Sequence, residues 1–224
     1  MACLEGKVAI VTGGGTGIGK GIALALAGEG CSVVIASRNF ERLHEVALEI
    51  EKQGSSSLAV KTDVSDEGSV LELFNAAKNR FGRLDILVNN AGIVIGGEIG
   101  DIPLERWETL MGVNVRGVFL CTREAFKIMK GAGGGRIINI GSIASERPRE
   151  NSAPYTTSKH AVWGLTKSTA LDGRPYGISC GQLNPGNTLV EWRAALEEVE
   201  GMEIVEEPMI EVADMARAVL YMAS

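Results

Sequence analysis

A strand-like run, a glycine-rich turn and a helix-like run follow one another near the start of the chain, and they restrict the possible folds most strongly. Residues 7–11 (Lys-Val-Ala-Ile-Val) have the apolar, β-branched character of a short strand. Residues 12–19 contain five glycines, and residues 20–27 are typical of a helix. This order directs backbone N–H groups and a helix N-terminus at a phosphate. The segment therefore predicts a nucleotide-binding α/β unit.

Two kinds of phosphate-binding motif compete for this turn. Residues 14–20 nearly match the Walker A pattern, but Gly21 follows where a Ser or Thr is needed to hold magnesium. The later strand-like run 85–90 also ends in asparagines and not in an aspartate. These features disfavour an NTPase. The strict G-x-G-x-x-G pattern is out of register too, and the turn reads Thr12-Gly13-x-x-x-Gly17-x-Gly19. Its place between a strand and a helix favours a dinucleotide site over a simple loop.

The rest of the chain alternates between strand-like and helix-like segments, without a linker, a repeat or a break in composition. Strands are predicted at 32–36, 58–64, 84–88, 136–140 and 177–183. Helices are predicted at 40–53, 67–81, 104–130, 152–171, 189–199 and 212–222. Strict alternation argues for a parallel sheet with right-handed crossovers. We therefore predict a Rossmann-type, doubly wound parallel sheet with helices on both faces, as one domain over residues 1–224.

The end of the second predicted strand bears on the choice of dinucleotide. An acidic side chain about 20 residues beyond the glycines holds the ribose 2′-hydroxyl of NAD, whereas an arginine accommodates the 2′-phosphate of NADP. Here the strand is followed by Ser37-Arg38-Asn39, without an acid. Ser37 and Arg38 favour NADP(H), and NAD(H) stays possible. The alternative is that Arg38 is a solvated loop charge.

Tyr155 and Lys159 are four residues apart in a predicted helix, so both side chains would lie on one face. A free phenol has a pKa of about 10, and a fixed ammonium nearby favours the phenolate. Such a pair suits proton transfer at a carbonyl or an alcohol. Pairs with this spacing also arise by chance, so the prediction depends on the other motifs.

Asn114 lies near the middle of the predicted helix 104–130, although asparagine has a low helix propensity. If it is buried there without partners, it costs about 1–3 kcal/mol. Its role is either purely structural or that of a functional amide at a kink.

Charge and cysteine content exclude several classes of protein. The net charge is −6 without a basic stripe, so we expect no nucleic-acid partner. No segment approaches the ~20 apolar residues of a membrane span, so we expect no membrane partner. The cysteines are scattered, which favours free thiols in a reducing cytoplasm over a disulfide framework or a metal site. They are Cys3, Cys31, Cys121 and Cys180.

Taken together and in this order, the motifs resemble the short-chain dehydrogenase/reductase family, in its shorter type without a separate substrate domain. The resemblance covers residues 7 to about 190. It is carried by Thr12-Gly13-x-x-x-Gly17-x-Gly19, Asp63-Val64, Asn89-Asn90-Ala91-Gly92, Ser142 with Tyr155-x-x-x-Lys159, and Asn184-Pro185-Gly186.

The resemblance implies hydride transfer between a nicotinamide cofactor and a carbonyl or secondary alcohol. It implies that Tyr155 is the general acid/base and that Ser142 orients and polarises the substrate oxygen. Lys159 would lower the pKa of the tyrosine and bind the nicotinamide ribose, and Asn114 would hold a water for proton relay. The substrate would enter over Ser142 and Tyr155, beneath the 189–205 segment.

The resemblance also implies a set of cofactor contacts along the chain. The pyrophosphate would lie on the glycine turn, the adenine against Asp63 and Val64, and the nicotinamide beside Pro185 and Gly186. The full set is Thr12, Gly13, Gly17, Ile18, Gly19, Ser37, Arg38, Asp63, Val64, Asn90, Ala91, Gly92, Tyr155, Lys159, Pro185, Gly186 and Thr188.

The chain departs from the family pattern at two places. A threonine that contacts the nicotinamide is often found at the position of Val190, and Thr188 is the nearest one here. The sequence also stops at Ser224, where family members usually add a seventh strand and a tail that help form the subunit interface. That strand and tail are expected to be absent or short, although we still expect a homodimer or homotetramer.

Two other functions compete with an oxidoreductase. A non-catalytic dinucleotide-binding regulator could use the same fold, but such proteins tend to lose the tyrosine or the lysine. A serine hydrolase would need a histidine near Ser142, and neither His44 nor His160 is placed by the sequence to serve. The substrate itself cannot be read, because loops at 93–100, 143–151 and 186–205 would form the walls of its pocket.

Overall fold

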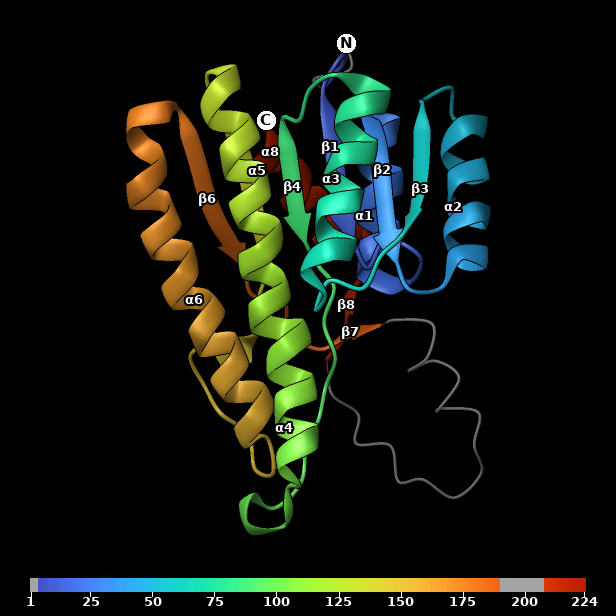
Figure 1. The fold of residues 1–224 in the computed structure, drawn as a ribbon. Coiled ribbons are helices and arrows are strands. Elements are labelled where there is room, and N and C mark those ends of the chain that lie inside the picture. Colours follow the sequence, from blue (N-terminus) through green and yellow to red (C-terminus); the bar gives the residue numbers. More distant parts are fainter. Residues whose placement is uncertain (1–3, 190–207) are drawn as a thin grey trace.

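Six parallel strands form the centre of the computed structural model, which describes residues 4–189 and 208–224. Their order across the sheet is β3-β2-β1-β4-β5-β6 (Figure 1). The strands are β1 (Val8–Thr12), β2 (Ser32–Ser37), β3 (Ser57–Lys61), β4 (Ile86–Asn89), β5 (Gly135–Ile140) and β6 (Ile178–Leu183). This is the strand order of a dinucleotide-binding Rossmann sheet, and it confirms the predicted fold class.

Helices cover both faces of the sheet (Figure 1). One core cluster joins the sheet to α1, α2 and α8, and a second joins it to α3 and α5. The strands are apolar on both faces, as strands of a parallel sheet between two helix layers must be. The helices are α1 (Gly17–Gly28), α2 (Phe40–Lys52), α3 (Glu67–Phe81), α4 (Leu104–Met111), α5 (Val118–Ala132), α6 (Ala153–Gly173) and α8 (Val212–Ala223).

The topology places a crevice at the carboxyl end of β1. Val11 pairs with Ile35 of β2 on one side and with Val88 of β4 on the other. The chain therefore leaves β1 between two strands whose connections run to opposite faces of the sheet. Ligands bind to open α/β sheets at such a reversal of strand order. The glycine turn, Arg38 and Asn90 all follow strands that end here.

The predicted helix 104–130 is wrong in its middle, where a π-helical turn (Gly112–Gly117) separates α4 from α5. Asn114 lies within this turn and is 2% exposed. At Gly117, an added Cβ would lie 2.8 Å from Cγ2 of Val64, so only a glycine lets the helix approach the loop after β3 this closely. The kink at Asn114, one of two alternatives at the sequence level, is therefore present as a π turn.

The prediction placed the end of the third strand too late, because β3 ends at Lys61. The backbone N–H of Thr62 still donates to the Ser37 carbonyl (2.8 Å), but that of Asp63 turns to the hydroxyl of Ser69 in α3 (3.0 Å). Asp63 and Val64 therefore lie in a loop beyond the end of the strand, where Asp63 is half-buried and Val64 is buried against Gly117.

Near the end of the chain the structure contains a small element that was not predicted. The two-residue strands β7 (Thr188–Leu189) and β8 (Ile210–Glu211) pair in parallel, apart from the main sheet. The first residue of the helix predicted at 189–199 belongs to β7, and residues 190–199 lie outside the described residues. Most of the 189–205 segment, which was expected to cover the substrate, lies outside the described residues too.

The described cysteines Cys31, Cys121 and Cys180 are all free thiols, and Cys3 lies outside the described residues. Over residues 4–189 and 208–224, no helix combines the length and the apolar character needed to cross a bilayer. The same part of the chain contains no cluster of His, Cys, Asp and Glu able to hold a metal ion.

Replacement of Gly19 by alanine should destabilise the protein by about 1–3 kcal/mol, since overpacking of a closely packed site costs this much. An added Cβ would lie 2.2 Å from the Gly13 carbonyl oxygen, which is backbone and cannot rotate away. The matched control is Gly131→Ala in α5, where no atom lies within 4 Å. The control should gain up to about 1 kcal/mol from helix propensity. Urea denaturation measures both, and equal effects would contradict the packing argument.

Candidate active site

The glycine turn after β1 is folded so that the start of α1 opens on the crevice. The backbone N–H of Gly13 donates to the Ala36 carbonyl (2.7 Å), which fixes the turn against the end of β2. Gly13 and Gly17 have φ angles of +66° and +52°, in the region that favours glycine. The first turn of α1 contains no acidic residue. Its unpaired N–H groups can therefore bind an anion such as a pyrophosphate.

Thr12 and Asn90 hold this turn from the side of β4. The Thr12 hydroxyl accepts hydrogen bonds from the backbone N–H groups of Asn90 (3.0 Å) and Ala91 (3.1 Å). The side-chain amide of Asn90 donates to the carbonyls of Thr12 (3.0 Å) and Gly13 (3.2 Å). The sequence left open whether the asparagines after β4 stabilise a turn or contact a ligand. The amide hydrogens of Asn90 stabilise the turn.

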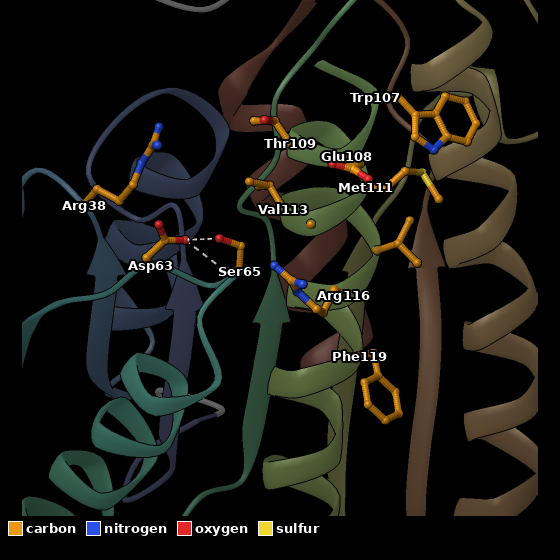
Figure 2. Close-up of a pocket in the computed structure, with 12 residues that line it drawn as sticks. Arg38, Asp63, Ser65, Trp107, Glu108, Thr109, Met111, Val113, Arg116 and Phe119 are labelled. Carbon is orange, nitrogen blue, oxygen red and sulfur yellow. Dashed lines mark hydrogen bonds between the residues drawn. The ribbon is translucent and has the colours of Figure 1, made fainter. Parts of the chain in front are cut away.

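A cavity of about 940 Å³ extends from the ends of β2 and β3 to the π turn (Figure 2). Figure 2 shows Arg38 and Asp63 on the strand side, across from Val113 and Arg116 of the π turn. The side chain of Arg38 is exposed. The cavity therefore joins the position predicted to select the cofactor to the position predicted for adenine.

Asp63 is anionic in this setting. Its carboxylate accepts hydrogen bonds from the hydroxyl (2.7 Å) and the backbone N–H (2.9 Å) of Ser65. The hydrogen bond from the Ser65 hydroxyl is the main cause that lowers the pKa of Asp63, and the positive charges of Arg38 and Arg116 lower it further. The carboxylate and its two arginine neighbours give the adenine end of the cavity fixed charges of both signs.

Ser142, Tyr155 and Lys159 meet at the carboxyl end of β5. The Ser142 hydroxyl lies close enough to the Tyr155 phenol to lower its pKa. The ammonium of Lys159 donates to the Ile140 carbonyl at the end of β5 (2.9 Å), and lies 5.5 Å from the centre of the Tyr155 ring. The structure thus brings together the three side chains on which the predicted chemistry depends.

The prediction that Lys159 lowers the pKa of Tyr155 is wrong in this geometry. Burial raises the pKa of Tyr155, and the groups that oppose this effect are the Ser142 hydroxyl and the positive charge of Arg149. The ammonium of Lys159 donates to the Ile140 carbonyl and is not among the groups that shift the pKa of Tyr155. Burial also lowers the pKa of Lys159 to about 8.

Asn114 holds the strand-end loop against α6. Its side-chain oxygen accepts from the backbone N–H of Ile93 (2.8 Å), and its amide donates to the Ile93 carbonyl (2.9 Å) and the Ser158 hydroxyl (3.1 Å). A Cβ added to Gly92 would lie 3.4 Å from the Asn114 side-chain oxygen and 3.9 Å from the Lys159 nitrogen. Gly92, Asn114 and Lys159 therefore border the same small space, as a shared role near the cofactor would require.

The loop after β6 closes the site beside Ser142. The Pro185 carbonyl accepts a hydrogen bond from the backbone N–H of Ile143 (3.1 Å). Thr188 is 8% exposed, and its hydroxyl donates to the Gly186 carbonyl (3.3 Å). This hydroxyl is turned toward its own loop, and its contact with a nicotinamide stays a prediction.

Several side chains that shape the site were not identified from the sequence. Ser158 is the partner of Asn114, Arg149 is the cation that acts on Tyr155, and Asn184 binds the backbone N–H of Ser142 (3.2 Å). Asn184 precedes Pro185-Gly186 in the motif, and this place could have drawn attention to it. The motif does not show what the Asn184 side chain binds. Arg149 lies in an exposed loop and belongs to none of the motifs, so no sequence pattern predicts its effect on Tyr155.

The residues present fit a nicotinamide dinucleotide. An extended ligand with two phosphates needs an anion site, room for adenine and a cation near the reacting end. The N-terminus of α1, the cavity beside Asp63 and the ammonium of Lys159 meet these needs from one edge of the sheet. Gly13 lets the turn pack closely against the loop after β4, since an added Cβ would lie 2.8 Å from the Asn90 amide nitrogen and 3.0 Å from Cα of Ala91.

Comparisons with known proteins agree with this geometry. The family model described as short chain dehydrogenase matches residues 7–201. The protein named Short chain dehydrogenase/reductase astE, from Aspergillus oryzae, is 37% identical over 232 aligned residues, which cover 99% of this chain and 89% of that protein.

Two solved structures with bound cofactors are also similar. The 3-ketoacyl-(acyl-carrier-protein) reductase of Brucella melitensis, complexed with NADH, has a TM-score of 0.89 and 35% identity, covering 99% of this chain and 92% of that one. The gluconate 5-dehydrogenase of Burkholderia cenocepacia, in complex with NADP and tartrate, has a TM-score of 0.91 and 33% identity, covering 100% of this chain and 90% of that one. Fold, motif order and full-length similarity lead to one conclusion: the chain belongs to the short chain dehydrogenase family.

Proposed function

We propose that this nicotinamide-dependent oxidoreductase prefers NADP(H) and transfers a hydride between it and a carbonyl or secondary alcohol, with Tyr155 as the general acid/base. The observation that carries the proposal is that the Tyr155 phenol and the Ser142 hydroxyl meet beside the buried ammonium of Lys159. A phenol, an alcohol and a cation in contact can hold a carbonyl oxygen and supply a proton to it.

When bound, the cofactor supplies the hydride donor or acceptor, and the protein's residues handle the oxygen and its proton. Ser142 donates a hydrogen bond that orients the substrate oxygen, and Tyr155 gives that oxygen its proton in the direction of reduction. Because burial raises the pKa of Tyr155, the phenol holds its proton at neutral pH, as an acid must. Lys159 binds the nicotinamide ribose, and Asn114 holds a water that relays protons between Lys159 and the solvent.

The preference for NADP(H) is supported by the residues beyond β2. Residues 37–39 contain no acid that would hold a 2′-hydroxyl. Arg38 and Lys61 line a second hollow of about 430 Å³ on the outer side of the same loop. Ser37 and Lys61 are paired across β2 and β3, so both cations belong to adjoining strand ends. Two positive charges at this place suit the 2′-phosphate of NADP.

We further propose that residues 1–224 form one NAD(P)-binding domain, with the substrate site at the carboxyl edge of the sheet. The protein is proposed to be cytoplasmic, to form a homodimer or homotetramer, and to have no nucleic-acid partner. The net charge of −6 and the free thiols of the described cysteines support these proposals.

Tyr155→Phe should lower kcat by at least about 100-fold, because the proton donor is lost while the ring is kept. The assay is the reduction of a panel of ketones and aldehydes, followed by the absorbance of NADPH. NADPH binding, measured by fluorescence titration, should be retained. The matched control is Tyr176→Phe at the end of η4 (Arg174–Tyr176), where the half-buried ring packs against Phe126. Unchanged turnover in Tyr155→Phe would refute the catalytic role.

Arg38→Asp should shift the cofactor preference toward NAD(H), because a carboxylate repels the 2′-phosphate and can accept from a 2′-hydroxyl. We expect the KM for NADPH to rise and that for NADH to fall. Lys78→Asp, on the exposed side of α3, makes the same charge change away from the cavity and should leave the ratio of the two KM values as in the parent. Equal KM values for NADPH and NADH in the parent protein would contradict the preference.

The buried ammonium of Lys159 should make stability depend on pH. Its folded pKa of about 8 lies below the ordinary value of 10.5, so between these values the folded protein binds fewer protons than the unfolded chain. The free energy of unfolding therefore rises with pH across this window, by about 3 kcal/mol from this group. Lys159→Met should abolish that rise, and the control Lys78→Met should keep it. Urea denaturation at pH 8 and at pH 10.5 measures it, and parallel changes in the parent and Lys159→Met would contradict the burial effect.

A further inference from the structure

The backbone N–H of Ser142 is held by a side chain and not by a strand. The last ladder bond between β5 and β6 runs from the Gly141 N–H to the Leu183 carbonyl (2.7 Å). One residue further, the Ser142 N–H donates to the side-chain oxygen of Asn184 (3.2 Å) instead of to a strand. The Asn184 side chain therefore helps to fix Ser142, together with the Ala144 N–H, which donates to the Ser142 hydroxyl (3.1 Å), and the Ile143 N–H, which donates to the Pro185 carbonyl.

The Asn184 side chain is in turn fixed by Gln182. The side-chain amide of Gln182 donates to the same Asn184 oxygen (2.8 Å) and to the Ser145 hydroxyl (3.0 Å). Ser145 ends η3 (Ile143–Ser145), the short helical turn that Ser142 begins, and it is 1% exposed. Gln182 thus reaches both ends of the turn that carries Ser142.

Gln182 is anchored on the side away from the site. Its side-chain oxygen accepts a hydrogen bond from the Thr166 hydroxyl of α6 (3.1 Å), which is 2% exposed. Both amide hydrogens and the oxygen of Gln182 are therefore used by protein groups. Because Tyr155 and Lys159 lie on the same helix as Thr166, Gln182 links the helix of the acid/base to the turn of the serine.

Gly141 provides the room for this arrangement. A Cβ at residue 141 would lie 2.2 Å from the Asn184 oxygen and 2.5 Å from the Gln182 amide nitrogen. The φ angle of Gly141 is not positive, so a glycine is required here for space and not for an unusual backbone conformation. The side chains of Gln182 and Asn184 occupy the place that a side chain at position 141 would take.

We propose that Gln182 is a positioning residue of the hydride-transfer reaction, which sets Ser142 against Tyr155 through Asn184 and Ser145. The proposal rests on the function given above to Ser142. Gln182 does not touch the reacting atoms in this arrangement. Its contribution is to hold the serine hydroxyl where it can donate a hydrogen bond to the substrate oxygen. A displacement of about 1 Å at such a place can lower the rate about 100-fold.

The test compares Gln182→Leu, Ser142→Ala and the double variant in steady-state reduction of the fastest carbonyl compound of the panel. Gln182→Leu should lower kcat by about 10- to 100-fold, with the KM for NADPH within about twofold of the parent. The double variant should be no slower than Ser142→Ala alone, because both changes remove one and the same interaction. Ser55→Ala is the control, since the Ser55 hydroxyl donates a partly buried hydrogen bond to the Ala27 carbonyl (2.7 Å), outside this network. It should lose stability and keep kcat.

Gln182→Glu is the second variant in case leucine impairs folding. It keeps an oxygen for Thr166 but lacks the hydrogens that reach Ser145 and Asn184, so it should lower kcat by the same factor as Gln182→Leu. A readout without substrate is the tyrosinate absorbance of Tyr155, taken as the difference from Tyr155→Phe. Ser142→Ala and Gln182→Leu should both move its formation to higher pH, by equal amounts.

The outcomes separate the two proposals. A normal kcat in Ser142→Ala would overturn the function given to Ser142, and the positioning role with it. A slow Ser142→Ala beside a normal Gln182→Leu would overturn the positioning role alone. The positioning role would also be overturned if the losses of kcat in the two single variants multiplied in the double variant, because Gln182 would then act independently of Ser142.

Discussion

The burial of one ammonium group at the end of β5 is the constraint on which the site depends. Lys159 is 8% exposed, and its ammonium donates a hydrogen bond to the Ile140 carbonyl. Removing a charge from water is costly unless it is paired, so this position would not be tolerated for packing alone. The cost is offset by the rest of the fold. In the proposed mechanism, the protein gains a cation that lies beside the acid/base and binds the nicotinamide ribose.

Much of the fold could be predicted from local sequence patterns. The β-branched runs, the glycine turn and the spaced helices determine the element order, and the order of the motifs identifies the crevice. The site was predictable where one residue type has few other uses at its position, as for Gly13, Tyr155 and Asn114. It was not predictable where the role depends on which side chain fills a space. Gln182 and Asn184 lie on the same strand and loop as the Pro185-Gly186 motif, but only coordinates show that they meet Ser142. The pKa of Tyr155 also escaped prediction, because it depends on burial and on the direction of the Lys159 ammonium.

Polar side chains inside the sheet connect the catalytic edge to the helices behind it. Asn139 of β5 accepts from the amide of Asn89 (2.8 Å) and donates to the Thr166 hydroxyl (2.8 Å), and it is 0% exposed. Thr166 then contacts Gln182, so the bonds run across the strands toward Ser142. Buried networks of this kind restrict how their side chains can be arranged, although the Asn89 side-chain oxygen has no hydrogen-bond partner within the described residues. The geometry of the site is therefore set partly by residues in the core that never meet a ligand.

The π turn at Gly112–Gly117 has a consequence for chain length. A hydrogen bond that spans five residues encloses one residue more than the regular α-helical bond does. A homologue with an uninterrupted helix would therefore be one residue shorter here, and an alignment should place its gap inside this turn. Placed elsewhere, the gap would shift Asn114 out of correspondence while leaving the helices on both sides apparently well matched.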